Sequence, residues 1–306
     1  MKYLITGGLG YLGIELAYHL SHNSKNKIVI YDKAIYGVEH ASYVLNKKNI
    51  SLIVGDIRDK DRLLPCIKEA DTIIHLASLV GAPLVHKRPV ESYETNIIGT
   101  EQLTSAVADN QRLLFASTGS TYGKVENICT EDTPISPLSA YGAHKAKGEE
   151  IVSKKNALSM RFATVYGLSF RTRNDLYINN MVKKALIDRS VVLYEQFARR
   201  TFIHIHDIVR AVEYFSLDEN FLSGPLNIGD PDLALTKIDV CNKIAELTEF
   251  HIISNEYAED MDQRDYEVSY DKMTAKGFKC KVVFDDAMDG LLNYYQSLFT
   301  ASYENG

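Results

Sequence analysis

Short apolar runs alternate with helical stretches through the first half of the chain. The runs predicted to be strands are KYLIT (2–6), KIVIY (27–31), ISLIV (50–54), DTIIHLA (71–77) and RLLFAST (112–118). Between most of them, apolar residues recur at the spacing of one helix face. Because these strands are almost continuously apolar, the pattern predicts a parallel sheet with helices on both faces. Ligands of such sheets bind beyond the carboxyl ends of the strands.

The pattern loosens after about residue 167. A polar loop leads into a helix within RTRNDLYINNMVKKALIDRS (171–190), RRTFIHI (199–205) predicts a strand, and residues 236–250 and 285–299 predict helices. No low-complexity linker separates the two halves of the sequence, and no internal repeat is apparent. We therefore expect a second, smaller C-terminal α/β lobe that closes over one edge of the parallel sheet.

A glycine-rich turn follows the first predicted strand. In GGLGYLG (7–13), Gly7, Gly10 and Gly13 recur at three-residue spacing, with a strand before them and a helical stretch after them. Such glycines allow a tight turn and let a pyrophosphate approach the free N–H groups of the helix N-terminus. Asp32 follows the second strand, where a carboxylate binds both ribose hydroxyls and repels a 2′-phosphate. The expected cofactor is NAD rather than NADP, although the adjacent Lys33 weakens this distinction.

Charge and composition exclude several other classes of protein. The formal net charge is −6 and the basic residues are scattered, which argues against a nucleic-acid partner. The apolar stretches are short, and no signal-type apolar region precedes the first strand, so we expect a cytoplasmic protein without a membrane partner. The four cysteines form no CxxC pair and are expected to be reduced. His204 and His206 share one face of a predicted strand, but no third ligand lies near them, so no metal site is predicted.

A tyrosine and a lysine lie four positions apart in YGAHK (141–145). This spacing places Tyr141 and Lys145 on one face of a helix, where their polar ends can converge on one point. Both residue types are common on helix surfaces, however, so the pair by itself does not establish a reactive site. The surrounding motifs decide between these alternatives.

The order and spacing of many short motifs resemble one enzyme family. The glycine-rich turn, Asp32, VGDIRD (54–59), HLAS (75–78), NIIGT (96–100), STGSTYG (117–123) and YGAHK resemble the extended short-chain dehydrogenase/reductases that act as nucleotide-sugar epimerases and dehydratases. The resemblance continues through RFATVYG (161–167), RRTFIHIHD (199–207), NIGD (227–230) and QRDYEVS (263–269), and so spans nearly the whole chain. It implies a Rossmann-type doubly wound sheet, with residues 1–167 mainly binding NAD, residues 168–306 mainly forming the substrate-binding lobe, and the segments interleaved.

The resemblance implies a catalytic set of Thr118, Tyr141 and Lys145. Free tyrosine titrates near pH 10, but a nearby ammonium and the positive nicotinamide ring favour the phenolate. Tyr141 would then take a proton from a sugar hydroxyl while hydride leaves the same carbon. Lys145 would also hold the nicotinamide ribose, and Thr118 would hydrogen-bond the reacting oxygen.

The resemblance further implies two sets of binding residues. The cofactor set is Gly7, Gly10, Tyr11, Leu12, Gly13, Asp32, Asp56, Ile57, Leu76, Ala77, Ser78, Asn96, Tyr141, Lys145 and Tyr166. The substrate set, in which arginines bind the diphosphate, is Thr118, Thr164, Arg171, Arg173, Arg200 and Arg264. Alternatives remain open for several members: Asp56 as a helix N-cap, Asn96 as a side chain bonded to backbone within a helix, Tyr166 as a core residue, and any arginine as part of a surface ion pair.

Two departures from the family pattern narrow the expected reaction. Family members that expel water from a hexose carry an Asp-Glu pair after the catalytic threonine, whereas this chain has Gly119 and Ser120. A 4,6-dehydratase is therefore disfavoured. Thr164 replaces the family's usual asparagine, and this variant, with LVGAPL (79–84), resembles a subgroup that includes bacterial GDP-heptose carbon-4 dehydrogenases of capsule and cell-surface sugar pathways.

Three functions follow from the resemblance. The first is NAD-dependent oxidation at carbon 4 of a nucleoside-diphosphate sugar such as a GDP-heptose, and the second is 4-epimerisation by the same catalytic set. The third, a non-catalytic NAD-binding regulator, is disfavoured because Tyr141 and Lys145 are both present. A homodimer is also expected, because residues 89–109 and 139–155 predict helices whose family counterparts pair across a two-fold axis.

Overall fold

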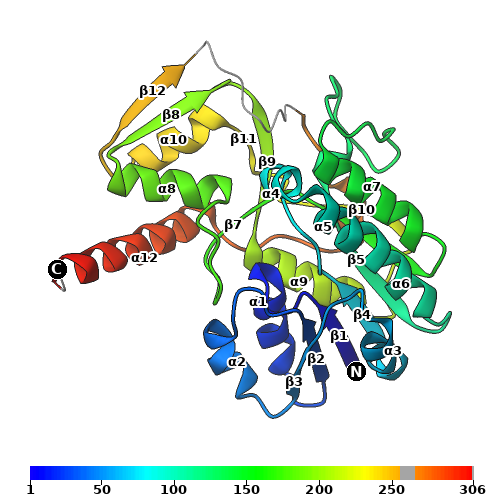
Figure 1. Cartoon of the computed structure of the whole chain (residues 1–306). Coiled ribbons are helices and arrows are strands. Elements are labelled where there is room, and N and C mark those ends of the chain that lie inside the picture. Colours follow the sequence, from blue (N-terminus) through cyan, green and yellow to red (C-terminus); the bar gives the residue numbers. More distant parts are fainter. Residues whose placement is uncertain (256–265, 305–306) are drawn as a thin grey trace.

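A computed structural model (Figure 1) describes residues 1–255 and 266–304, with side chains described up to residue 299. Its centre is a seven-stranded parallel sheet with the order β10-β6-β5-β4-β1-β2-β3. The strands are β1 (Lys2–Thr6), β2 (Lys27–Asp32), β3 (Ile50–Val54), β4 (Thr72–His75), β5 (Arg112–Thr118), β6 (Ala157–Phe162) and β10 (Gly224–Ile228). Strands β2 and β3 are added on one side of β1, and β4, β5, β6 and β10 are added on its other side. This change of side between β3 and β4 confirms the predicted doubly wound fold.

Helices cover both faces of this sheet. On one face, α1 (Tyr11–Ser21) packs against α9 (Ile205–Ser216). On the other face, α6 (Gly99–Ala106) lies between α3 (Lys60–Glu69) and α7 (Ala140–Val152). Separate clusters of buried apolar side chains fill the two interfaces, which explains why the strands show almost no polar alternation.

Shorter helical segments connect these elements. They are η1 (Glu39–Ala41), α2 (Ser42–Leu45), α4 (Ala82–Lys87), α5 (Pro89–Tyr93), η2 (Glu94–Ile98), η3 (Gly119–Thr121) and α11 (Asp271–Ala275). The helix predicted over residues 89–109 therefore consists of α5, the π-helical η2 and α6 in succession, and it ends at residue 106. The π-helical turn shifts the side chains of η2 relative to a regular helix, and this matters for Asn96 below.

A second lobe is built mainly from the later part of the chain and lies at upper left in Figure 1. It holds α8 (Tyr177–Ile187), α10 (Lys237–Ala245) and α12 (Phe284–Glu304). Its strands are β7 (Thr164–Tyr166), β9 (Arg199–His204) and β11 (Ala234–Thr236) in one small sheet, and β8 (Ser190–Tyr194) and β12 (His251–Asn255) in another. The segments interleave, because β10 completes the main sheet while β7 belongs to the second lobe.

The helix predicted over residues 236–250 is shorter than expected. Thr236 and Asp239 form a reciprocal capping box at its start, and α10 ends at Ala245. Residues 246–250 form no regular element, and the chain then enters β12, which pairs in parallel with β8. In the part of the chain that the structure describes, no helix is both long and apolar enough to span a lipid bilayer.

Candidate active site

The glycine-rich turn joins β1 to α1 with almost no space for side chains. Gly7 has φ +71°, and a Cβ added to it would lie 2.7 Å from the backbone nitrogen of Ala77. A Cβ on Gly13 would lie 2.5 Å from the carbonyl oxygen of Gly7. Gly7 is required both by its positive φ and by the lack of space for a Cβ, and Gly13 is required by the lack of space alone. The turn exposes the N-terminus of α1 beyond the carboxyl end of β1, where a pyrophosphate would bind.

Asp32 is fixed beside this turn at the end of β2. Its carboxylate accepts hydrogen bonds from the backbone N–H of Leu9, at 3.0 Å, and of Ala34, at 2.8 Å. The carboxylate is thus oriented by the glycine-rich turn itself. A crowded turn, a helix N-terminus and an oriented carboxylate are the groups that NAD needs for its diphosphate and adenosine ribose.

Asp56 lies in the loop after β3 and is held by cations. Its carboxylate accepts hydrogen bonds from the Arg58 guanidinium, at 2.7 and 2.9 Å, and lies 3.2 Å from Lys33 Nζ. The Arg58 hydrogen bonds hold the pKa of Asp56 well below its ordinary value. The N-cap interpretation of Asp56 is wrong, because Asp59 caps α3 by accepting from the backbone N–H of Arg62.

The loop after β4 lies against the glycine-rich turn and is held in place by Asn96. The Asn96 side chain accepts hydrogen bonds from the backbone N–H of Leu79, at 2.8 Å, and from Ser78 Oγ, at 3.0 Å. It also donates to the carbonyl oxygen of Leu79. Asn96 therefore braces the loop that lies against the glycine-rich turn, and it does so from a π-helical turn.

The end of β5 and the start of α7 lie side by side. Thr118 Oγ1 accepts from the backbone N–H of Ser120 and caps η3. A Cβ added to Gly142 would lie 2.7 Å from the carbonyl oxygen of Ser120, so the first turn of α7 packs directly on η3. Tyr141, in that first turn, has only 7% of its surface exposed. The structure thus brings Thr118 and Tyr141 to the same edge of the sheet.

Lys145 lies one turn further along α7 and is buried. Its Nζ donates to the carbonyl oxygen of Ala116, at 2.8 Å, and lies 4.9 Å from the centre of the Phe115 ring. Only 4% of the residue is exposed. Burial lowers the pKa of Lys145 to about 7, although the carboxylate of Glu149 partly opposes this effect. A lysine with a pKa lowered by burial loses its proton more readily than an exposed lysine does.

A buried polar network behind these residues ties α7 to the sheet. Glu149 accepts hydrogen bonds from Ser117 Oγ and from the guanidinium of Arg161, the latter at 2.8 Å. Arg161 also donates to Tyr122 Oη, which in turn donates to Asn227 Oδ1 at 2.6 Å. The network connects α7, β5, β6 and β10, and thereby fixes the helix that carries Tyr141 and Lys145. The sequence analysis missed it, although a charged residue within an apolar strand is a signal for such a network.

The predicted substrate arginines do not all point to one place. Arg171 stacks on the ring of Tyr36, with its guanidinium 3.6 Å from the ring centre. Tyr36 lies in the loop that follows β2. Arg171 therefore lies on the glycine-rich side of the site. Arg173 pairs with Asp175 on the same polar segment, at 3.1 Å. Both arginines belong to a segment that Ser169 ties to α1 by donating to the carbonyl oxygen of Tyr11.

The other predicted residues belong mainly to the second lobe. Arg200, on β9, is buried with its guanidinium 5.0 Å from the centre of the Tyr177 ring. Thr164 is the first residue of β7 and is only partly buried. Arg264 lies outside the described residues.

Tyr166 is a core residue of the second lobe. It is fully buried, with its ring against His204 and Phe284. This is the second of the two alternatives left open for it. His204 also caps α9 by accepting from the backbone N–H of His206, so it has a packing role at this helix start.

Among the described residues, one group of possible metal ligands lies near Tyr166. Oxygen or sulfur atoms of Asp207, Asp230 and Cys280 are within 4.8 Å of one another. The Asp207 carboxylate, however, already accepts from the backbone N–H groups of residues 281 and 282, both at 3.0 Å. These two hydrogen bonds explain the position of the Asp207 carboxylate, which holds the segment that precedes α12.

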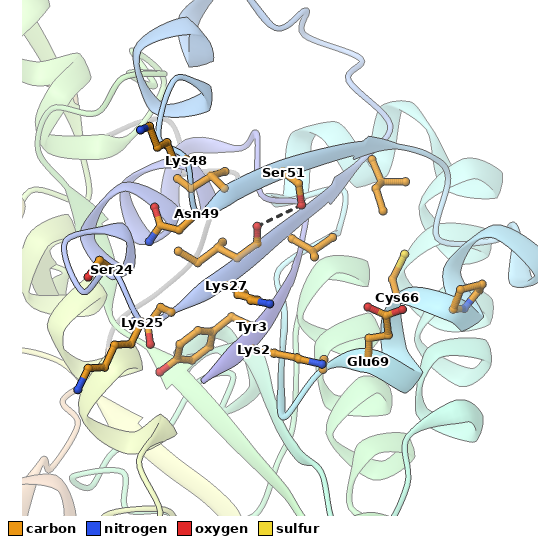
Figure 2. Close-up of a pocket in the computed structure, with 17 residues that line it drawn as sticks. Lys2, Tyr3, Ser24, Lys25, Lys27, Lys48, Asn49, Ser51, Cys66 and Glu69 are labelled. Carbon is orange, nitrogen blue, oxygen red and sulfur yellow. Dashed lines mark hydrogen bonds between the residues drawn. The ribbon is translucent and has the colours of Figure 1, made fainter.

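A cavity of about 690 Å³ lies at the opposite end of the main sheet (Figure 2). Its walls come from the amino-terminal halves of β1 and β2, from β3 and from α3, and its polar rim includes four lysines: Lys2, Lys25, Lys27 and Lys48. Parallel sheets bind their ligands at the carboxyl ends of the strands. The cavity is therefore separate from the residues at the ends of β1, β2 and β5.

Comparison with known proteins agrees with this geometry. The family described as NAD dependent epimerase/dehydratase matches residues 3–229. The low-salt glycan biosynthesis protein Agl12 of Haloferax volcanii is 27% identical over 96% of this chain and 98% of its own length. UDP-glucuronic acid decarboxylase 6 of Arabidopsis thaliana is 27% identical over 81% of this chain and 74% of its own.

A solved structure shares the fold. The UDP-glucuronic acid 4-epimerase of Bacillus cereus, in complex with UDP-glucuronic acid and NAD, superposes with a TM-score of 0.86 at 24% identity, over 97% of this chain and 100% of that one. The family match confirms the predicted cofactor, NAD, and the prediction that the protein is an enzyme. The chain belongs to the NAD-dependent epimerase/dehydratase family.

Proposed function

We propose that this protein oxidises carbon 4 of a nucleoside-diphosphate sugar. The observation that carries the proposal is the packing of the first turn of α7 on η3, which brings Tyr141 to the same edge as Thr118. Lys145 follows on the same helix and is anchored to β5 through the carbonyl oxygen of Ala116. These three side chains supply a proton acceptor, a cation and a hydrogen-bonding hydroxyl.

The chain's own residues would perform the proton transfer. Tyr141 accepts the proton of the carbon-4 hydroxyl, and Thr118 hydrogen-bonds the oxygen as it becomes a carbonyl. The Lys145 ammonium, when charged, favours the phenolate form of Tyr141. Bound NAD+ would supply the hydride acceptor for carbon 4, so that loss of one C–H bond and one O–H bond would balance formation of the C=O bond. Asp32 and the N-terminus of α1 would bind the dinucleotide, and the buried Glu149–Arg161 pair would hold α7 in position.

Elimination of water is not part of this proposal. Gly119 and Ser120 follow Thr118, and neither side chain can act as an acid or base at neutral pH. Losing an acid or base costs a factor of roughly 100 to 10,000 in rate. The ketone formed at carbon 4 is therefore expected to persist or to be reduced again.

A 4-epimerase is the second candidate function. It uses the same residues but returns the hydride to the other face of the ketone. The structural similarity to the Bacillus cereus 4-epimerase supports this alternative. The motif resemblance to GDP-heptose carbon-4 dehydrogenases supports net oxidation of a GDP-heptose-like substrate, with Arg200 among the candidates for binding the diphosphate.

A homodimer through α5, α6 and α7 is also proposed. The Tyr93 ring lies 6.1 Å from the His144 ring, so the end of α5 contacts α7. Val90 and Tyr93 nevertheless remain largely exposed. Exposed apolar residues beside two adjacent helices support a paired surface.

The test is incubation of the purified protein with UDP-, GDP-, CDP- and dTDP-sugars in deuterated water. Mass spectrometry and NMR should find a 4-keto sugar or a sugar inverted at carbon 4. Accumulation of NADH would identify net oxidation, and its absence with inversion would identify epimerisation. Loss of water together with deuterium at carbon 5 would refute the proposal, because both are signatures of a dehydratase.

A further inference from the structure

A tyrosine hydroxyl occupies the space beside Thr118 where a side chain would normally lie. A Cβ added to Gly119 would be 2.9 Å from the hydroxyl oxygen of Tyr266 and 3.4 Å from its ring. Real Cβ atoms almost never approach another atom within 3.0 Å. Residue 119 can thus carry no side chain while Tyr266 keeps this position, and the phenol takes the place of that side chain.

The chain segment that carries Tyr266 is held by two main-chain hydrogen bonds to Cys129. Val268 forms a parallel bridge with Cys129, whose backbone N–H donates to the carbonyl oxygen of Glu267 at 2.8 Å. The backbone N–H of Ser269 donates back to the carbonyl oxygen of Cys129 at 2.9 Å. The segment is therefore bonded to the loop that follows η3, and its position is set by the main chain.

Tyr266 itself is packed but retains some access. Its ring lies edge-on to the ring of Tyr122, with centres 6.3 Å apart, and 8% of the residue is exposed. Tyr122 belongs to the buried network that fixes α7. The phenol is consequently oriented by the same framework that positions Tyr141, and its oxygen is directed toward Gly119.

We propose that Tyr266 is a specificity-determining residue that hydrogen-bonds a hydroxyl group of the sugar next to carbon 4. The inference rests on the proposed function, because Thr118 is assigned there to the oxygen on carbon 4. The proposal places the Tyr266 hydroxyl, which takes the place of a side chain at residue 119, opposite the atoms that flank this carbon. A phenol both donates and accepts, which suits a neutral sugar hydroxyl. The Tyr266 hydroxyl can occupy this position because Gly119 has no side chain.

The test compares binding of whole and truncated ligands. Isothermal titration calorimetry is carried out on protein saturated with NADH, which cannot oxidise a sugar alcohol. UDP-glucose is compared with UDP, and GDP-mannose with GDP. In the Tyr266→Phe variant the better nucleotide sugar should bind about 3- to 10-fold more weakly, the loss expected for one hydrogen bond, while its nucleoside diphosphate binds unchanged. Tyr270→Phe, on the same segment but behind Gly229, is the matched control and should change neither affinity.

The outcomes separate this inference from the function beneath it. If neither nucleotide sugar binds the unmutated protein more tightly than its own nucleoside diphosphate, the proposed substrate class is refuted and the role of Tyr266 with it. If the unmutated protein does discriminate and Tyr266→Phe discriminates equally well, only the role of Tyr266 is refuted. Equal weakening of both ligands would assign Tyr266 a structural role and also overturn the inference.

A second variant tests the contact with Gly119. The added methyl group of Gly119→Ala should displace the Tyr266 hydroxyl and weaken sugar binding at least as much as Tyr266→Phe does. In the Tyr266→Phe background the same change should cost less than 2-fold further, because the hydroxyl that it displaces is already absent. Independent, multiplicative losses in the double variant would contradict the proposed pairing of these two residues.

Discussion

Replacing Lys145 with methionine should stabilise the protein while it removes activity. Lys145 is buried among apolar groups, with the carbonyl oxygen of Ala116 as its hydrogen-bond acceptor and Glu149 as the nearby carboxylate. Methionine has a similar length and no charge, so it fills the same space. Lys145→Met is therefore predicted to lose catalytic activity and to gain conformational stability.

The magnitude follows from the pKa of Lys145. Burial lowers this pKa from its ordinary value of 10.5 to about 7. By linkage, that difference corresponds to about 4 kcal/mol of unfavourable free energy at pH 7. Loss of the hydrogen bond to Ala116 offsets roughly 1 to 2 kcal/mol of the gain. Lys145→Met should thus be more stable than the unmutated protein by about 2 to 3 kcal/mol at pH 7.

The sign of the pH dependence is fixed by which state binds more protons. Between pH 7 and 10.5 the unfolded chain keeps the Lys145 proton and the folded chain loses it, so the stability of the unmutated protein rises with pH. The advantage of Lys145→Met is therefore largest and constant below pH 7. It should shrink by about 2 kcal/mol between pH 7 and pH 9.

Urea unfolding of nucleotide-free protein at pH 6, 7, 8 and 9, followed by circular dichroism, measures this directly. Lys147→Met is the matched control, because Lys147 is an exposed lysine on the same helix that pairs with Glu150. It should leave the dependence of stability on pH nearly unchanged. A Lys145→Met variant that is less stable than the unmutated protein at pH 6, or a difference that does not vary with pH, would refute the reasoning.

Three further outcomes are expected. Nucleotide released from the purified protein should be NAD(H), and Asp32→Ala should lower the preference for NAD over NADP; recovery of mostly NADP(H) would contradict the role of Asp32. Tyr141→Phe should retain the fold and NAD binding but lose at least 100-fold in kcat, and near-normal turnover would exclude Tyr141 as the proton acceptor. Light scattering at micromolar concentration should find a dimer that Tyr93→Glu dissociates, whereas a monomeric unmutated protein would rule out the proposed surface.

The features that could be predicted from the sequence are those encoded in consecutive residues. The glycine-rich turn and Asp32 belong to one strand–turn–helix–strand unit, so their spacing nearly determines their positions. The first five strands were predicted from apolar runs, and the predicted strand ends differ from the observed ones by about two residues or fewer. The Tyr141–Lys145 spacing likewise predicted a shared helix face.

The features that were missed depend on contacts between distant segments. Glu149 and Arg161 form a buried pair only because α7 crosses β6, and no periodicity marks either residue. Residues 246–250 were predicted to continue a helix, yet they connect the end of α10 to β12, whose partner β8 is distant in the sequence. The proximity of Tyr266 to Gly119 joins two segments that are far apart in the sequence, so it could not be predicted from local pattern.

The stacking of Arg171 on Tyr36 bears on how long the enzyme keeps its nicotinamide cofactor. The contact joins the segment after β7 to the loop after β2, beside the turn that would bind NAD, and Tyr36 is 56% exposed. A cation–π contact at such an exposed site contributes only about 0.5 to 1 kcal/mol, so as a latch it would stand open for roughly a sixth to a third of the time. A latch this weak would slow the escape of NADH without preventing it. In the proposed reaction at carbon 4, the choice between net oxidation and inversion would then depend on two rates, the departure of NADH past this loop and the rotation of the ketone within the pocket.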